Sequence, residues 1–353
     1  MDPAAPRPDL IPPPPTGAKT FHCVEAHTEG EPLRIILSGF EDLRGDTILA
    51  RRRDAHDRLD DLRRALMWEP RGHADMYGCI VVPAEREGSD FGVLFTHNEG
   101  YSTMCGHGVL AMARVAVELG LVPVVRPVTT MVMDTPAGPV RATVKLDQET
   151  GAVQAVSFQN VPSWVVSLDG EIRVPGVGAV SYDVAFGGAF YAYVDADALG
   201  LTLEPASTQR LIKMGRAIKE AVQAADPPRH PAGEDLSFLY GTIFTGPASD
   251  LRHHSRHVCV FADGEVDRSP TGTGVSGRLA LLRAREQITV GETVGIESIL
   301  GSRFYCRIAE EQDRADEPGP QIVPEVEGRA WVIGATQWVI DPQDPFRSGF
   351  LLR

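Results

Sequence analysis

The chain is short of cysteine and has no excess of positive charge, and each shortage excludes a class of protein. Its 353 residues include five cysteines and no Cys-x-x-Cys pair, so we expect reduced thiols and a cytoplasmic location instead of a disulfide scaffold. Lysine and arginine number 34 against 48 acidic residues, a formal net charge of −14. This charge argues against a nucleic-acid surface, which needs a basic patch. No apolar run reaches membrane-spanning length, so no membrane partner is expected.

Metal-ligand patterns and a targeting signal are also lacking. His253, His254 and His257 have no cysteine or acidic partner at ligand spacing, which favours an exposed loop over a zinc site. Residues 1–19 are rich in proline and lack a cationic start followed by an apolar stretch. They are expected to form an extended or disordered tail, not a targeting peptide.

The length of the chain suits two domains. We predict an N-terminal domain over residues 20–155 and a C-terminal domain over 156–337, with the segment from about 338 to 353 able to return to the first domain. Apolar periodicity predicts one helix over 54–67, and two buried helices over 109–119 and 275–285. Alternating or β-branched runs predict many short strands around the two buried helices, at 21–26, 33–38, 79–83, 91–96, 131–134, 140–146, 153–158, 182–186, 190–194, 240–245, 257–261, 293–297, 303–308 and 330–340. Residues 312–320 form a predicted polar loop.

A glycine-flanked motif occurs twice, with its reactive residue changed. The first copy reads Cys-Gly-His-Gly from Cys105, and the second reads Thr-Gly-Thr-Gly from Thr271. Each copy precedes an apolar helix-like run. Because the first N–H groups of a helix lack partners and carry partial positive charge, each start can hold an anion. Two converging starts would hold one carboxylate without arginine, which suits an acidic protein.

Cys105 is the candidate reactive group of the first copy. A thiol at a helix start is expected to have a lowered pKa, because the helix dipole favours the thiolate. A thiolate there could remove the α-proton of an amino acid if the developing charge spreads into a bound carboxylate. The alternative is a buried structural cysteine.

Thr271 stands where a symmetric two-base enzyme would need a second acid. A threonine hydroxyl does not titrate near neutrality, so a one-base reaction is favoured over racemisation; simple helix capping is the alternative role. Asp267 could pair with a substrate ammonium, or could serve only as a turn residue or ion-pair partner of Arg268. His107 could orient the same amine or a hydroxyl.

These motifs resemble those of the proline racemase family. The matching stretches include 69–78, 98–101 leading into 104–108, 186–191 and 267–274. The resemblance implies an α+β fold like that of diaminopimelate epimerase. Two pseudo-symmetric domains would each form a curled β-sheet or barrel around a central helix, with the active site in the cleft between them. It implies no cofactor and no metal.

The resemblance also implies roles for single residues. Cys105 and Thr271 occupy the two catalytic positions, both of which are cysteine in proline racemases and 4-hydroxyproline epimerases. Gly106, His107, Asp267, Gly272 and Thr273 are expected to contact the substrate. Tyr77, Phe95 and Phe261 fall where the family has pocket aromatics, although a plain core role fits each of them as well.

The threonine at position 271 resembles the trans-3-hydroxy-L-proline dehydratases of the same family. The implied reaction is loss of water from hydroxyproline, a small-molecule partner, to give Δ1-pyrroline-2-carboxylate. Two alternatives stay open: an isomerase that racemises proline or epimerises 4-hydroxyproline, and a non-catalytic amino-acid-binding protein. A homodimer is left open.

Overall fold

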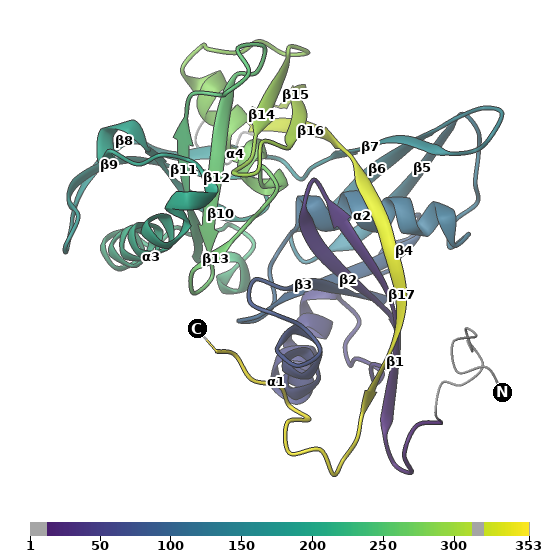
Figure 1. Ribbon diagram of the computed structural model, residues 1–353. Helices are drawn as coiled ribbons and strands as arrows, with labels where there is room; N and C mark the ends of the chain where they lie inside the picture. The colour runs from purple at the N-terminus through teal and green to yellow at the C-terminus, as the bar shows by residue number, and fades with distance from the viewer. Residues whose placement is uncertain (1–12, 313–320, 353) are drawn as a thin grey trace, which may run out of the picture.

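A computed structural model describes residues 13–312 and 321–352, and it shows two lobes of strands, each curled around one helix (Figure 1). The predicted tail lies mostly outside the described residues, and the predicted loop at 312–320 lies outside them except for its first residue. β1 begins at Lys19 and pairs there with Ile340, so the ordered strand starts slightly before the predicted Phe21. Among the described residues, no helix combines the length and apolarity needed to cross a membrane.

Within its described residues, the N-terminal half contains two α-helices and seven strands. The helices are α1 (Ile48–Met67) and α2 (Gly106–Glu118). The strands are β1 (Lys19–Thr28), β2 (Glu31–Ser38), β3 (Tyr77–Val82), β4 (Phe91–His97), β5 (Val128–Thr135), β6 (Gly138–Leu146) and β7 (Val153–Gln159).

The C-terminal half has the same general plan. Its helices are α3 (Thr208–Ala225) and α4 (Gly272–Ala284). Its strands are β8 (Trp164–Val174), β9 (Gly178–Phe186), β10 (Phe190–Asp195), β11 (Leu239–Gly246), β12 (Ser255–Phe261), β13 (Glu265–Val266), β14 (Thr293–Glu297), β15 (Arg303–Gln312), β16 (Gln321–Gly328) and β17 (Ala330–Ile340).

The strand pairing repeats in the two halves. In the first half, β1 pairs antiparallel with β2, β2 is parallel to β3, and β4 is parallel to β5. In the second half, β9 pairs antiparallel with β10, β10 is parallel to β11, and β12 is parallel to β14. β7 and β16 pair with each other and join the halves. The curled-sheet fold predicted from the sequence is therefore confirmed.

The last strand returns to the first half. β17 pairs with β1 along its whole length, as β8 pairs with β9 in the other half. In Figure 1 this long yellow strand runs down beside the purple β1. The predicted domain limits at 155 and 337 stay a prediction, but the pairing begins at Ala330, before the predicted point of return.

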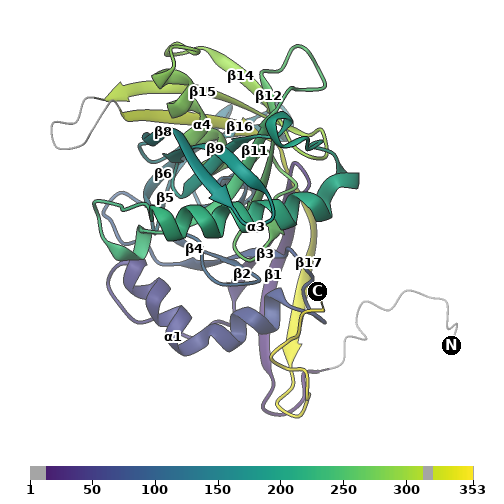
Figure 2. The ribbon, with the colours of Figure 1, turned by 90° about the vertical axis from the view of Figure 1, so that its left-hand side faces the viewer.

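Each half has an inner and an outer helix. α2 is buried almost all round, and α4 has a similarly buried run from Gly272 to Gly277. α1 packs on β4 and α3 on β11 and β12, each on the outside of its sheet (Figure 2). The sequence analysis did not predict α3, although its buried residues Leu211, Gly215, Ile218 and Val222 follow helical spacing.

Candidate active site

The two inner helices meet end to end at their N-termini. A Cβ atom built on Gly106 would lie 2.5 Å from the Cα of Gly272, and one on Gly272 would lie 2.6 Å from the Cα of Gly106. Only glycine allows two backbones to approach so closely. The first turns of α2 and α4, whose first N–H groups have no backbone partner within their own helix, therefore converge on one place.

A buried cavity lies at this meeting point. It is lined by Tyr77, Met104, Cys105, Gly106, His107, Tyr191, Tyr240, Phe261, Asp267, Thr271, Gly272 and Thr273. The free space is about 20 Å³, room for a water molecule and not for an amino acid. The structure thus shows the site closed, and the walls must separate to admit a substrate.

Cys105 is the N-cap residue of α2. Its backbone is extended, with φ −145°, and its Sγ accepts a hydrogen bond from Gly108 N at 3.2 Å. Burial raises the pKa of this thiol well above its ordinary value; the Gly108 N–H opposes the rise, and the nearby Asp267 adds to it. The sequence-based expectation of a lowered pKa is wrong for the closed site, because desolvation outweighs the helix start.

His107 lies directly beside the thiol. Its Nδ1 is 3.3 Å from Cys105 Sγ, and its backbone carbonyl accepts a hydrogen bond from Thr28 Oγ1 at 2.8 Å. Burial lowers the pKa of His107 to about 3. The imidazole is therefore neutral at physiological pH and acts there as a hydrogen-bonding group, not as a cation.

Asp267 provides the negative charge of the site. It is 4% exposed, and its Oδ1 accepts a hydrogen bond from Ser269 N at 2.7 Å. Burial raises its pKa to about 6, against the lowering effect of Ser269. The carboxyl is thus an anion above about pH 6 and lies where a substrate ammonium can reach it through the cavity.

Thr271 takes the position that mirrors Cys105 but differs from it in conformation. Its φ is +68°, an uncommon value for a β-branched residue, and its side chain makes no capping bond to α4. Its hydroxyl lowers the pKa values of Asp267 and Cys259 and so lies near both. Its Oγ1 nevertheless has no hydrogen-bond partner of good geometry among the described residues, although it is buried. The capping role considered from the sequence is not what the structure shows.

Most of the predicted site residues come together at this cavity. Cys105, Gly106, His107, Asp267, Thr271, Gly272, Thr273, Tyr77 and Phe261 all line it. Phe95 does not line the cavity. It is fully buried on β4, and its ring lies 2.8 Å from a Cβ atom built on Gly108, so it packs against the first turn of α2.

The sequence analysis missed Met104, Tyr191 and Tyr240 as lining residues. Tyr77 OH lies 3.1 Å from Tyr240 OH across the two halves and donates to Ser102 Oγ at 2.6 Å. Tyr191 OH lies 2.7 Å from Thr273 Oγ1. Tyr191 stands within the recognised stretch 186–191, which was the available signal, whereas no motif pointed to Tyr240.

Metal ligands do not gather anywhere in the described residues: no group of three or more histidine, cysteine, aspartate or glutamate side chains is placed to hold a metal ion. The prediction that His253, His254 and His257 lie in an exposed loop is wrong in part. His257 is fully buried on β12, and His253 Nδ1 contacts Glu297 Oε1 at 2.9 Å.

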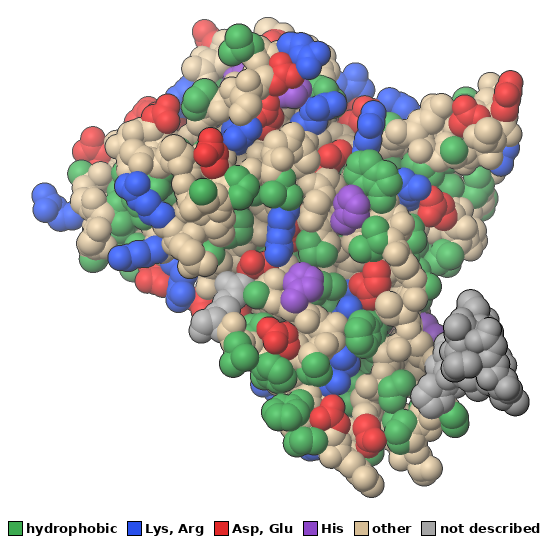
Figure 3. Space-filling model, in the orientation of Figure 1, with side chains coloured by type: hydrophobic (Ala, Val, Ile, Leu, Met, Phe, Trp, Pro, Cys, Tyr) green, Lys and Arg blue, Asp and Glu red, His purple; other side chains and the backbone are tan. Residues whose placement is uncertain are grey.

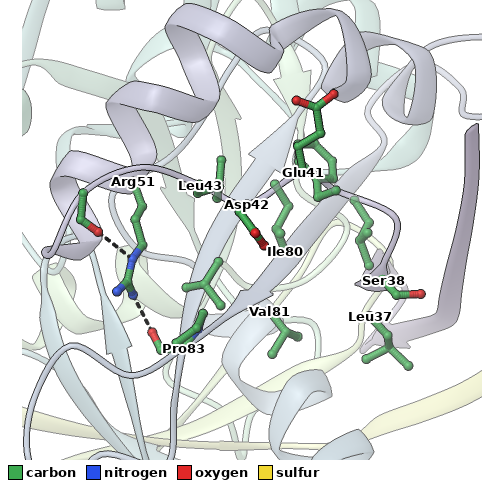
Figure 4. Close-up of a pocket in the computed structure, with 13 residues that line it drawn as sticks. Leu37, Ser38, Glu41, Asp42, Leu43, Arg51, Ile80, Val81 and Pro83 are labelled. Atoms are coloured by element: carbon green, nitrogen blue, oxygen red, sulfur yellow. Dashed lines mark hydrogen bonds between the residues drawn. The ribbon is translucent and has the colours of Figure 1, made fainter.

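A larger hollow of about 290 Å³ lies elsewhere, between β2, β3 and the segment before α1 (Figure 4). The Arg51 guanidinium beside it donates to the carbonyls of Gly45 at 3.0 Å and Pro83 at 2.6 Å. Glu41 is paired with Arg58 at 2.9 Å and with Lys19 at 2.5 Å. Since these charged groups already have partners, the cavity between the helix starts is the better candidate site.

On the face shown in Figure 3, acidic and basic side chains are interspersed. Such mixed charge does not form the continuous basic patch that phosphate binding needs.

Residues 23–351 match the sequence pattern described as proline racemase. The chain belongs to the proline racemase family. The chain is 52% identical to the trans-3-hydroxy-L-proline dehydratase of Colwellia psychrerythraea, over 95% of this chain and 93% of the relative. It is 44% identical to the 4-hydroxyproline 2-epimerase of Streptosporangium roseum, over 95% of this chain and 99% of the relative.

A solved structure has the same architecture. The hydroxyproline epimerase from Agrobacterium vitis, crystallised with trans-4-hydroxy-L-proline, superposes with a TM-score of 0.88 at 29% identity. The match covers 95% of this chain and 96% of the other. Family membership makes the chain an enzyme of racemase or hydro-lyase type. Because relatives of both types match, the choice between the two reactions is argued from the residues of the site.

The contact between the helix starts yields the first prediction. Gly106→Ala should lower kcat/KM at least about 100-fold, because the added methyl group forces α2 and α4 apart and an error of 1 Å in a catalytic group has that order of effect. Steady-state kinetics of the purified variant measure the loss. The control is Gly100→Ala, since a Cβ atom there meets nothing within 4 Å. Equal activities of the two variants would contradict the prediction.

Proposed function

We propose that the protein is a trans-3-hydroxy-L-proline dehydratase that forms Δ1-pyrroline-2-carboxylate with a single base. The observation that carries the proposal is that Thr271 and Cys105 line the same cavity. A hydroxyl of ordinary acidity cannot relay a proton to the second face of a carbanion near neutral pH. The hydroxyl of Thr271 therefore disfavours epimerisation, which needs a proton carrier on each face. Elimination remains possible, because it needs a base on one face only.

Substrate binding uses the charges of the cavity. The substrate carboxylate accepts hydrogen bonds from the N–H groups at the starts of α2 and α4. The ring ammonium pairs with Asp267. Burial is the main cause of the raised pKa of Cys105 in the closed site, and the charge of Asp267 adds to the rise. The ring ammonium offsets the contribution of Asp267 and so favours the thiolate, with Gly108 N and His107 as its hydrogen-bond partners.

In the chemical step, the Cys105 thiolate removes the proton from Cα. In the trans isomer the 3-hydroxyl and the carboxylate lie on opposite ring faces, so the hydroxyl shares a face with this proton. The electron pair of the broken C–H bond forms a Cα–Cβ double bond as the C–O bond breaks, and the leaving oxygen takes the proton back from sulfur as water. The thiolate is restored, and the enamine tautomerises to Δ1-pyrroline-2-carboxylate.

The location and the oligomeric state accompany this proposal. A cytoplasmic location is supported by the five cysteines, all of which are free and buried. The sequence leaves a homodimer open, and size-exclusion chromatography with light scattering measures the oligomeric state directly.

The alternative function is an epimerase of hydroxyproline. It is favoured by relatives of that name at 44% identity. It requires an acid or a water molecule on the Thr271 face, and it predicts change of configuration at Cα without loss of the ring oxygen.

The function test is a panel of proline and hydroxyproline isomers with two readouts, pyrroline-2-carboxylate and optical rotation. We expect water loss from trans-3-hydroxy-L-proline and no epimer from trans-4-hydroxy-L-proline. Cys105→Ser should lower water loss at least about 1,000-fold, since the general base is removed. Cys79→Ser, a buried cysteine outside the cavity, is the matched control. Epimer without water loss would overturn the assignment.

Restoring the second thiol tests the one-base argument. Thr271→Cys should gain exchange of the α-proton with solvent, or epimerisation, because a titrating group then lies on the second face. Deuterium incorporation from D2O measures this by NMR, under reducing conditions, since Cys259 lies nearby. Thr271→Ser, which keeps a hydroxyl, should gain neither. If a folded, substrate-binding Thr271→Cys variant also gained neither, the two-face argument would fail.

The pKa of Asp267 predicts an acid limit of activity. Its carboxyl is an anion above about pH 6 and neutral below, so kcat/KM should fall about tenfold for each further unit below that value. Asp267→Asn should lose activity at all pH values, because the amide cannot pair with the ammonium. A rate profile that stays flat well below pH 6 would contradict this assignment.

A further inference from the structure

Glu31 is a buried carboxyl to which the mechanism above gives no role. It is the first residue of β2, at the end of the tight turn from β1, and it is 0% exposed. Its Oε2 accepts a hydrogen bond from Arg268 N at 2.7 Å. Its Oε1 has no hydrogen-bond partner among the described residues.

The position of Glu31 links the two halves of the site. Arg268 follows Asp267 directly in the chain, so the bond from Glu31 holds the backbone of the substrate-binding segment from the opposite half of the molecule. The same turn also holds the other half-site, since Thr28 donates to the His107 carbonyl. One turn therefore contacts the segments that carry Asp267 and His107.

The charges around Glu31 do not balance if every carboxyl is ionised. Among the described residues, the guanidinium that pairs with Glu31 is that of Arg268, 3.6 Å from Oε2, and it also lies 3.7 Å from Asp75 Oδ2. Asp267 adds a third acidic group, and the thiols of Cys105 and Cys259 also lie within electrostatic reach of Glu31. A buried anion with one unpaired oxygen is costly, and a proton on Oε1 removes the charge from this carboxyl, so that only the smaller cost of an unpaired neutral group is left.

We propose that Glu31 is a positioning residue for Asp267: a neutral carboxylic acid of one half that fixes the Asp267–Arg268 segment of the other across the cleft. Because Glu31 is neutral, Asp267 remains the anion that meets the substrate ammonium. The inference thus rests on the proposed function for its catalytic consequence, but not for the state of the carboxyl.

The electrostatics of the site agree with this geometry. Burial raises the pKa of Glu31 well above its ordinary value, the charge of Asp267 raises it further, and Arg268 opposes the rise. Asp267 is less affected, with a pKa of about 6. Of these two carboxyl groups, Glu31 therefore keeps its proton to the higher pH.

The test uses the neutral mimic Glu31→Gln, which keeps an oxygen acceptor for Arg268 N, and the short variants Glu31→Asp and Glu31→Ala, which cannot reach it. We expect Glu31→Gln to keep kcat/KM within about threefold and to leave the acid limb of the pH profile in place. Glu31→Asp and Glu31→Ala should lose at least about 30-fold, mainly through a higher KM. Glu29→Ala removes a carboxylate from the same turn and is the matched control, expected to be close to the wild type.

Infrared spectroscopy reports the proton directly. At pH 8 the wild type should show a carbonyl band of a protonated carboxylic acid that is missing in Glu31→Gln, whether or not the enzyme is assayed. Absence of that band, or a shift of the acid limb to lower pH in Glu31→Gln, would show an ionised Glu31 and overturn the proposal.

Full activity of Glu31→Ala would overturn the positioning role. If circular dichroism shows that Glu31→Ala does not fold, the activity of Glu31→Asp and the infrared band of the wild type test the proposal instead. If the wild type shows no water loss, the proposed function fails alone, and the same variants are compared by exchange of the substrate α-proton.

Discussion

The close contact between Gly106 and Gly272 is the constraint on which the active site depends. It brings the starts of α2 and α4 together, so that two sets of free N–H groups face one small cavity. An acidic protein can thereby bind a carboxylate without placing an arginine in the site. The surrounding strands support this contact: each half curls around one inner helix, and the β7–β16 pairing joins the two halves.

Burial governs the chemistry of the cavity more strongly than the helix starts do. Desolvation raises the pKa values of Cys105 and Asp267 and lowers that of His107. The closed site therefore disfavours charge on the thiol until a cation arrives. In the proposed mechanism a substrate ammonium supplies that cation, so the charge that pairs with Asp267 also helps to ionise the base.

Much of the fold and the site could be predicted because the strongest signals are local. The inner helices lie within three residues of their predicted starts, since a glycine pair followed by an apolar run is readable without tertiary information. The helix α3 was missed although its sequence carries a signal, because its buried residues Leu211, Gly215, Ile218 and Val222 have helical spacing. The sequence could not show that Phe95 belongs to the core and that Tyr240 lines the cavity, because that distinction depends on how the two halves meet. The sign of the Cys105 pKa shift failed for the same reason, since burial is a property of the closed cleft.

The two halves are built alike, yet the reactive positions differ in more than their side chains. Cys105 has an extended backbone and accepts the Gly108 N–H bond, whereas Thr271 has a left-handed φ and caps nothing. A β-branched residue in that conformation costs of order 1–3 kcal/mol. No hydrogen bond between Oγ1 and the described residues offsets this cost. Backbone strain of this kind is typical of functional positions, which agrees with the proposed role of Thr271 beside the substrate. In that proposal the duplicated fold provides a similar helix start on each side of the carboxylate, while the two reactive positions differ in chemistry.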